Sequence, residues 1–221
     1  MELLSIREKE IFETLNKIRK YNFVIIGGYA VNAYTLPRFS IDCDIVIKDK
    51  EELYKIEKIL LKSEYKKAIE KNGFAKYEKD LGNYFKVNID VLIKEVFDRQ
   101  TNAIFLAGWI FENSNLKILK GKTIKEELKL RILNIDALFT MKVISGRITD
   151  IRDVFMLAPA IKNKEWIKHE IMQRYDIAKL LSKIEKKILS KRFRDDLQGV
   201  YGFIEDRIFD KHKNAVLDLA N

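Results

Sequence analysis

Two short stretches of the sequence decide the fold: Phe23-Val24-Ile25-Ile26-Gly27-Gly28-Tyr29-Ala30 and Arg38-Phe39-Ser40-Ile41-Asp42-Cys43-Asp44-Ile45. The first is an apolar run that enters two glycines and continues with helical spacing. It predicts a strand over 23–26, a tight turn and a helix over 29–35. Backbone N–H groups at such a turn can hold an anion. The second stretch predicts a buried strand over 42–47 that begins with two acids.

Asp42 and Asp44 are two residues apart, so their carboxylates leave the same face of the predicted strand. Two like charges side by side destabilise a sheet unless a cation lies between them. Together with the glycine turn, the two acids therefore indicate a site for a nucleotide with a bound metal ion. Cys43 lies on the opposite face, where a packed thiol is expected.

These residues resemble the nucleotidyltransferase superfamily with the polymerase-beta-type fold. The local sequence Gly-Gly-Tyr-Ala-Val-Asn … Arg-Phe-Ser-Ile-Asp-Cys-Asp most resembles the minimal branch of this superfamily, which includes AbiEii-type toxins and small antibiotic-modifying enzymes. The resemblance implies an α+β fold, in which a nucleotidyltransferase-type mixed β-sheet domain flanked by helices is followed by an all-helical domain. It also implies a divalent metal cofactor, Mg²⁺ or alternatively Mn²⁺, and a nucleoside triphosphate such as ATP as substrate.

The resemblance implies catalytic and metal-binding roles for Asp42, Asp44 and a third acid on a neighbouring strand that follows a hairpin. Asp90 is the candidate, because it lies in the apolar run 88–93, where a charge has no obvious structural task. In this role it would bind the metal and accept the proton of the attacking hydroxyl. Two metal ions about 3.5–4 Å apart can serve both the attacking and the leaving oxygen. An aspartate at a strand end facing water has the same sequence pattern.

Nucleotide-binding roles are expected for Gly27, Gly28, Arg38 and Ser40. The glycines allow the backbone to approach the phosphates closely. The pattern Arg-x-Ser/Thr-x-Asp-x-Asp is common in the branch that the chain resembles, and there Arg38 would pair with a triphosphate oxygen or with one of the acids. A surface arginine after Pro37 would look the same in the sequence.

A second motif lies in residues 138–153, where Lys142 is followed by Arg147, Asp150 and Asp153. It resembles the AbiEii-type motif, in which the lysine reaches the nucleotide phosphates and the arginine and acids form a possible active-site wall. Lys142 stands in an otherwise apolar helical segment, which is unusual without an anionic partner. The two acids also suit a helix start, because the first turn of a helix favours carboxylates.

The net charge of +9 is unevenly distributed, since residues 1–119 carry 20 Lys and Arg against 18 Asp and Glu, and residues 120–221 carry 22 against 15. A basic second half suits a polyanionic acceptor, and a solvated lysine-rich surface accounts for it equally well. No apolar run approaches the roughly 20 residues of a membrane span. The N-terminus does not resemble a signal peptide, so a cytoplasmic location without membrane contact is expected.

The elements expected elsewhere are a first helix up to Lys20, a helix over 51–61, strands over 74–77 and 84–93, and a strand or two within 103–119. From Asn134 onward the periodicity is helical, with breaks expected at Pro159 and Gly199. The shift from mixed to helical character predicts a nucleotidyltransferase domain over 1–119 and a helical domain over 120–221.

The predicted function is metal-dependent transfer of a nucleoside monophosphate from a nucleoside triphosphate to an acceptor hydroxyl, with release of pyrophosphate. RNA, including a tRNA end, is the favoured acceptor. One alternative is a non-catalytic toxin–antitoxin component that binds nucleotide or nucleic acid and acts through an antitoxin or another protein partner. The other is an antibiotic-type nucleotidyltransferase that acts on a small molecule.

Overall fold

A computed structural model describes residues 2–71, 73–82 and 85–219. The chain divides into two compact units, and each is treated by itself. The first unit contains the residues up to Ala33 together with Pro37–Val96 and Phe105–Leu133. The second contains Tyr34–Leu36, Phe97–Ile104 and the residues from Asn134 onward. No helix of the described segments is long and apolar enough to cross a membrane.

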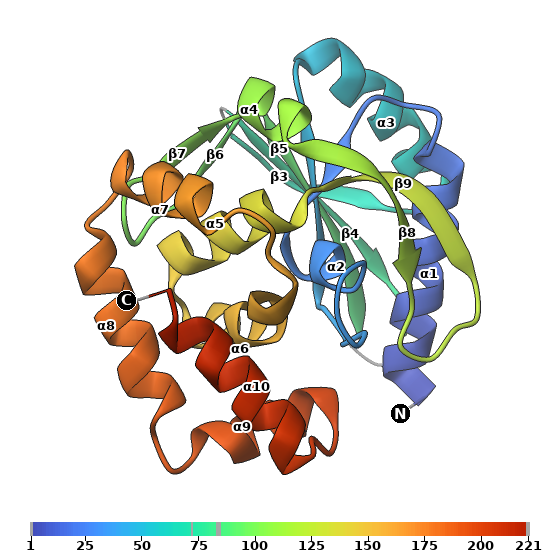
Figure 1. The fold of residues 1–221 in the computed structure, drawn as a ribbon. Helices are drawn as coiled ribbons and strands as arrows, with labels where there is room; N and C mark the ends of the chain where they lie inside the picture. Colours follow the sequence, from blue (N-terminus) through green and yellow to red (C-terminus); the bar gives the residue numbers. More distant parts are fainter. Residues whose placement is uncertain (1, 72, 83–84, 220–221) are drawn as a thin grey trace. The chain divides into compact units, whose positions relative to one another are not determined.

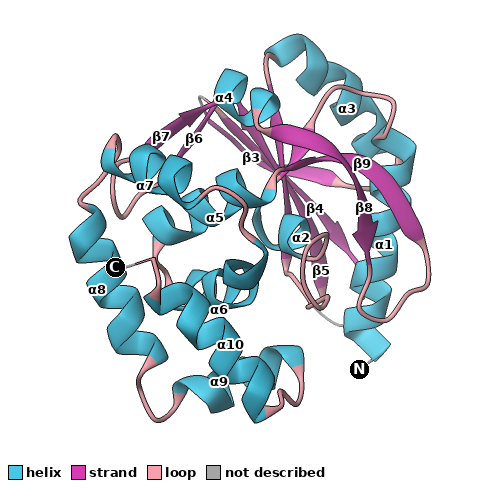
Figure 2. Ribbon diagram, in the orientation of Figure 1, coloured by secondary structure: helices cyan, strands magenta, loops and turns pink. Residues whose placement is uncertain are grey.

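The first unit is built on a mixed seven-stranded sheet with the order β3-β4-β5-β2-β1-β9-β8 (Figures 1 and 2). Its strands are β1 (Val24–Ile25), β2 (Asp42–Ile47), β3 (Lys66–Lys71), β4 (Phe74–Asp80), β5 (Lys86–Ile93), β8 (Ser114–Lys120) and β9 (Glu127–Leu133). The pairs β2–β5 and β1–β9 are parallel, and the other neighbours are antiparallel. The predicted α+β class with a mixed, helix-flanked sheet and C-terminal helices is confirmed.

Four helices accompany this sheet: α1 (Glu2–Ile18), α2 (Gly27–Val31), α3 (Lys50–Lys62) and α4 (Ala107–Glu112). α3 begins where the Asp49 side chain accepts a hydrogen bond from the backbone N–H of Glu52, a normal N-cap. α1 contacts β5, and α3 contacts both β2 and β5. The fully buried residues of these strands alternate with less buried ones, so one sheet face carries the core and the other carries the acids.

The strand 42–47 has the predicted bounds, while other elements differ. β1 is shorter than the predicted 23–26, and α2 occupies 27–31 instead of 29–35. The predicted strand 84–93 appears as β5 from Lys86, and its first residue, Tyr84, lies outside the described residues. β3 was not predicted, because all its side chains are exposed and show no apolar alternation.

The sheet unit extends further along the chain than residue 119. β9 lies between β8 and β1, so residues 127–133 complete the sheet. Buried Glu8 of α1 accepts hydrogen bonds from the backbone N–H groups of Lys122 and Thr123, which ties the preceding loop to the same unit. The last change from the first unit to the second along the chain therefore falls between Leu133 and Asn134, whereas the sequence predicted a helical domain from residue 120.

The second unit consists mainly of six α-helices (Figure 1). They are α5 (Ile135–Ser145), α6 (Ile148–Leu157), α7 (Lys164–Met172), α8 (Ile177–Ile188), α9 (Phe193–Tyr201) and α10 (Asp206–Leu217). α5 is buried on nearly every side and contacts α6, α7 and α8. Two further strands, β6 (Glu95–Phe97) and β7 (Ile104–Leu106), pair with each other in a separate two-stranded sheet. In the sequence they come after β5 and before α4.

One predicted helix break is correct and the other is wrong. Pro159 lies in a short 3₁₀ turn, Ala158–Ala160, that follows α6. Gly199 lies inside α9, and the chain instead leaves that helix at Gly202, which has a φ of 87°. A positive φ is readily adopted by glycine, so the chain can turn out of the helix at Gly202, whereas a glycine in a helix interior only weakens the helix.

Candidate active site

The register of β2 and β5 gathers the predicted acids on one face of the sheet. Asp42 lies beside Asn88, and Asp44 lies beside Asp90. Because strand side chains alternate, these four side chains share the face opposite the buried residues Cys43, Ile45 and Val91. The Asn88 amide donates a hydrogen bond of 2.7 Å to Asp42 Oδ1. Cys43 is fully buried, as predicted.

A lysine lies among these acids. Lys76 of β4 is registered opposite Asp90, and its Nζ lies 3.5 Å from both Asp42 Oδ1 and Asp90 Oδ1. Burial lowers the pKa of Lys76, but the charges of Asp90 and Asp42 outweigh it, so the pKa lies above its ordinary value. The ammonium group is therefore a protonated counter-ion of both carboxylates.

Asp90 is held in an unfavourable environment for a carboxylate. Burial and the nearby charge of Asp42 raise its pKa from 3.8 to about 6, although Lys76 acts in the opposite direction. Asp90 Oδ1 is buried and accepts no hydrogen bond from the described residues, and the same is true of Asn88 Oδ1. Buried oxygen acceptors without donors are expensive unless something else fills their coordination.

The chemistry of this donor set fits a hard divalent cation, because Mg²⁺ prefers carboxylate and carbonyl oxygens. The carboxylates of Asp42, Asp44 and Asp90, together with the unsatisfied amide oxygen of Asn88, supply such oxygens on one sheet face. Within residues 2–71, 73–82 and 85–219, however, no three His, Cys, Asp or Glu side chains are arranged to hold an ion together. In the present arrangement the Lys76 ammonium supplies the positive charge near two of the acids.

The glycine turn packs directly against this acid cluster. Gly27 has a φ of 65°, and a Cβ added there would lie 2.0 Å from Asp44 Oδ2. A Cβ at Gly28 would lie 2.4 Å from Ser40 Oγ and 3.1 Å from a guanidinium nitrogen of Arg38. A side chain at Gly27 would overlap Asp44, and one at Gly28 would require Ser40 and Arg38 to shift, so the two glycines let the start of α2 pack closely against these residues.

The loop before β2 is fixed to α2 by a side chain that sequence reasoning did not single out. Buried Asn32 accepts a hydrogen bond from Arg38 N and donates one to Arg38 O. Ser40 Oγ donates to the backbone carbonyl of Asp42, and a guanidinium nitrogen of Arg38 donates to the carbonyl of Phe39. Arg38 and Ser40 thus lie at the glycine turn, where the sequence predicted a nucleotide-binding role.

The second predicted motif forms a cluster inside the helical unit. Lys142 Nζ lies 2.6 Å from Asp150 Oδ1 and 2.9 Å from Asp153 Oδ2, and all three residues are buried. Asp150 also accepts hydrogen bonds from Ser145 and from Arg147, whose side chain is largely exposed. Burial favours a higher pKa for Asp150, but Lys142 and Arg147 outweigh it and lower the pKa.

The anionic partners that Lys142 was expected to need are therefore supplied by its own unit. Asp150 lies in the first turn of α6, where a carboxylate suits the start of a helix. Asp153 lies one turn later and accepts a hydrogen bond from Tyr201 of α9. The phosphate-binding role of Lys142 stays a prediction, as does the wall-forming role of Arg147, Asp150 and Asp153.

Sequence reasoning missed Lys76, Asn88 and Asn32. For the first two a signal exists, because the predicted strands 74–77 and 84–93, paired as a hairpin, place Lys76 near Asp90. Asn88 precedes Asp90 by two residues and so shares its face. Asn32 gives no such signal, since its bonds to Arg38 depend on how the intervening loop closes.

Comparisons with known proteins agree with this architecture. No family model and no curated protein matches the sequence. A candidate nucleotidyltransferase from H. pylori is similar in structure, with a TM-score of 0.53 and 15% identity over 100% of this chain and 92% of that one. ANT(2")-Ia in complex with adenylyl-2"-tobramycin is similar with a TM-score of 0.52 and 13% identity, over 78% of this chain and 97% of that one. The chain therefore shares its overall fold with these two structures.

Proposed function

We propose that the protein is a divalent-metal-dependent nucleotidyltransferase, which moves a nucleoside monophosphate from a nucleoside triphosphate to an acceptor hydroxyl. The observation that carries this proposal is the contact between the glycine turn and the acid cluster. The backbone of Gly27 lies so close to the Asp44 side chain that a Cβ at position 27 would overlap Asp44 Oδ2. Asp44 in turn lies beside Asp90 on the neighbouring strand. The turn that would bind the triphosphate and the oxygens that would bind the metal therefore lie side by side, which supports the proposal.

In the proposed reaction, the backbone at Gly27 and Gly28 binds the triphosphate, with Arg38 and Ser40 beside it. Asp42, Asp44 and Asp90 would hold the divalent ions, which supply charge neutralisation along the triphosphate. The acceptor oxygen attacks the α-phosphorus, and the bond from that phosphorus to the bridging oxygen of the β-phosphate breaks, so that pyrophosphate leaves. Asp90 would accept the hydroxyl proton, because a carboxylate that holds the ion beside the acceptor oxygen can also take its proton.

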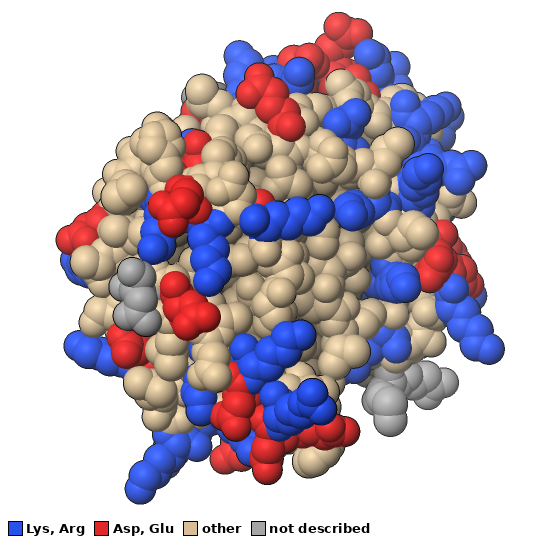
Figure 3. All heavy atoms as spheres, viewed as in Figure 1, with Lys and Arg blue, Asp and Glu red and all other residues tan. Residues whose placement is uncertain are grey.

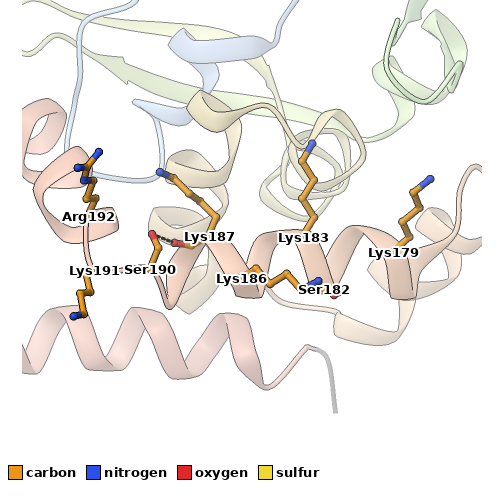
Figure 4. Close-up of a pocket in the computed structure, with 8 residues that line it drawn as sticks. All are labelled: Lys179, Ser182, Lys183, Lys186, Lys187, Ser190, Lys191 and Arg192. Carbon is orange, nitrogen blue, oxygen red and sulfur yellow. Dashed lines mark hydrogen bonds between the residues drawn. The ribbon is translucent and has the colours of Figure 1, made fainter.

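We favour RNA as the acceptor because the helical unit offers a basic surface on α8. An open hollow of about 710 Å³ is lined only by Lys, Arg and Ser side chains: Lys179, Ser182, Lys183, Lys186, Lys187, Ser190, Lys191 and Arg192 (Figure 4). On the face of the molecule shown in Figure 3, basic and acidic side chains are interspersed. The lining of the α8 hollow, by contrast, contains no acidic side chain.

The geometry of α8 suits a phosphate backbone. Lys179, Lys183 and Lys187 are spaced four residues apart, and Figure 4 shows them extending to the same side of the helix. Lys187 is paired with Asp196 at 2.7 Å. Exposed Lys183, by contrast, has no carboxylate within ion-pair distance among the described residues. The apolar face of α8, with Leu180, is buried in the unit and is not available for membrane insertion.

The experiment uses triphosphates labelled at either the α- or the γ-phosphate, with Mg²⁺ and total RNA. The proposal predicts α-label in an RNA product, γ-label in pyrophosphate, and no transfer after Asp44→Asn. Transfer of the γ-label to RNA would contradict nucleotidyl transfer. If expression of the protein in cells has an effect on them and the Asp44→Asn variant has the same effect, that effect does not need catalysis. This result would favour the non-catalytic toxin–antitoxin component, which only binds its nucleotide or nucleic acid.

A second candidate acceptor is a small molecule, since ANT(2")-Ia is bound to an adenylylated tobramycin in the similar structure. Salt distinguishes the two acceptors. RNA binding should weaken steeply between about 50 and 200 mM salt because counterions are released, whereas a small neutral acceptor should show little change.

The α8 surface is tested by replacing the exposed lysines Lys179, Lys183 and Lys186 with Gln. RNA affinity should fall for all sequences alike, and the slope of log affinity against log salt should shrink by about 0.7 for each phosphate that the variant no longer neutralises. A control that replaces the exposed lysines Lys58, Lys66 and Lys71 with Gln removes the same charge from the sheet unit. Equal effects of the two triple variants would contradict binding at α8.

A further inference from the structure

Lys76 holds an unusual position for a lysine in a sheet. It projects from β4 onto the same face as the acids, and its Nζ lies 3.5 Å from one oxygen of Asp42 and 3.5 Å from one oxygen of Asp90. The side chain is only 20% exposed. A positive charge thus lies within reach of two of the three carboxylates that would bind the metal.

The distances from the Lys76 ammonium to its carboxylates are longer than the shortest ion-pair distance of Lys79 on the same strand. Charge-assisted N–H···O bonds are normally about 2.7–2.9 Å long. Lys79, on the opposite face of β4, lies 3.0 Å from Glu10 Oε2, and the acid site itself contains a 2.7 Å bond from Asn88 to Asp42. Among the described parts of the chain, Asp90 Oδ1 still has no hydrogen-bond donor despite the ammonium nearby. Lys76 therefore neutralises the acids without completing the coordination of their oxygens.

We infer that Lys76 is a built-in counter-cation, which neutralises Asp42 and Asp90 while the site is free of metal and gives up this place when a divalent ion binds. This inference rests on the proposed function, because it concerns the same acids. Its physical basis is electrostatic, since an ammonium and a divalent ion compete for the same carboxylate oxygens.

Two consequences follow from this competition. Without metal, Lys76 stabilises the fold by separating two carboxylate charges in a partly buried place. With metal, the same lysine weakens ion binding, because its charge must move away from the acids or remain as a repulsive neighbour. Removal of the charge should therefore lower stability in a chelator and raise the affinity for a divalent ion.

The test compares Lys76→Met, which keeps the length of the side chain and removes its charge, with the wild-type protein. Mn²⁺ binding is measured at pH 8 by the loss of the free-ion electron paramagnetic resonance signal, and melting is followed in EDTA and in Mg²⁺. Mn²⁺ should bind the variant at least about tenfold more tightly, because a unit charge 3.5 Å from the ligands has been removed. Lys76→Gln should behave in the same way, and Lys76→Arg should bind Mn²⁺ like the wild type.

The matched control is Lys79→Met, which removes a paired, partly buried lysine from the opposite face of the same strand. It should lower the melting temperature and leave Mn²⁺ affinity unchanged. Equal or weaker Mn²⁺ binding by Lys76→Met would overturn the inference and leave the proposed function intact. An absence of Mn²⁺ binding by wild type and all variants would overturn both.

Discussion

Replacement of Asp90 by Asn should make the metal-free protein more stable while it abolishes the proposed activity. Asp90 has a pKa raised to about 6 from an ordinary 3.8, so the folded state binds its proton more tightly than the unfolded chain does. Stability from this group is therefore greatest below pH 4 and is lost as the pH rises through about 6. The substitution removes a group that opposes folding at neutral pH.

The size of the effect follows from the shift. About two pKa units correspond to at most about 3 kcal/mol at pH 7.5. The Asp90 side chain is 14% exposed, and water together with the lost attraction to Lys76 reduces this figure, so a gain of about 1–2 kcal/mol is expected. The gain should shrink as the pH is lowered from 7.5 to 4, because the native carboxyl is then protonated in the wild type too.

The assay is urea unfolding in EDTA across this pH range, repeated with Mg²⁺. Glu126→Gln, which neutralises an exposed carboxylate of the same unit, is the control and should change stability by less than about 0.5 kcal/mol. Mg²⁺ should stabilise the wild type more than the Asp90→Asn variant, because only the wild type offers the full set of ligands. A variant that is less stable than the wild type in EDTA at pH 7.5 would refute the reasoning and make Asp90 a structural acid.

The remaining predictions concern the glycines and the helical unit. Gly27→Ala should lower stability by at least about 1–2 kcal/mol from its left-handed φ, and kcat/KM for nucleotidyl transfer by about 100-fold, because the new Cβ displaces Asp44. Gly199→Ala is the matched control: its Cβ meets nothing within 4 Å and it lies inside α9, so urea unfolding should show a gain of about 0.5–1 kcal/mol. Lys142→Met should cost about 3 kcal/mol in the same assay, because it removes the lysine from two buried acids and leaves Asp150 with Arg147 alone as its cation. An unfolding free energy within about 1 kcal/mol of wild type would contradict this.

Much of the sheet unit could be predicted from the sequence, because its central signals are local. The strand 42–47 was predicted at its observed bounds, since two acids in alternate positions followed by an apolar run are typical of a strand that enters the core. The strand carrying Asp90 was also predicted, and its register beside β2 brings Asp90 next to Asp44. The sequence of one strand does not show which strand pairs with it. The expectation that Asp90 lies on a strand beside Asp42 and Asp44 came from the resemblance to the nucleotidyltransferase superfamily.

What could not be predicted depends on contacts between distant parts of the chain. β3 is an exposed edge strand that pairs with β4 through backbone hydrogen bonds. These bonds cannot be predicted from the pattern of apolar side chains, because all the side chains of β3 are exposed. β9 joins the sheet beside β1, although more than a hundred residues separate them. The buried cluster around Lys142 could not be predicted for a similar reason, because Asp153 in this cluster accepts a hydrogen bond from Tyr201 of a later helix.

The most direct test of the central claim is a crystal structure of the protein with Mn²⁺ and a non-hydrolysable nucleoside triphosphate, with data collected at the manganese absorption edge. The account predicts anomalous peaks within coordination distance of Asp42, Asp44 and Asp90, with the triphosphate against the backbone of Gly27 and Gly28. Manganese and nucleotide bound elsewhere on the protein, with the three carboxylates still arranged around Lys76, would contradict it.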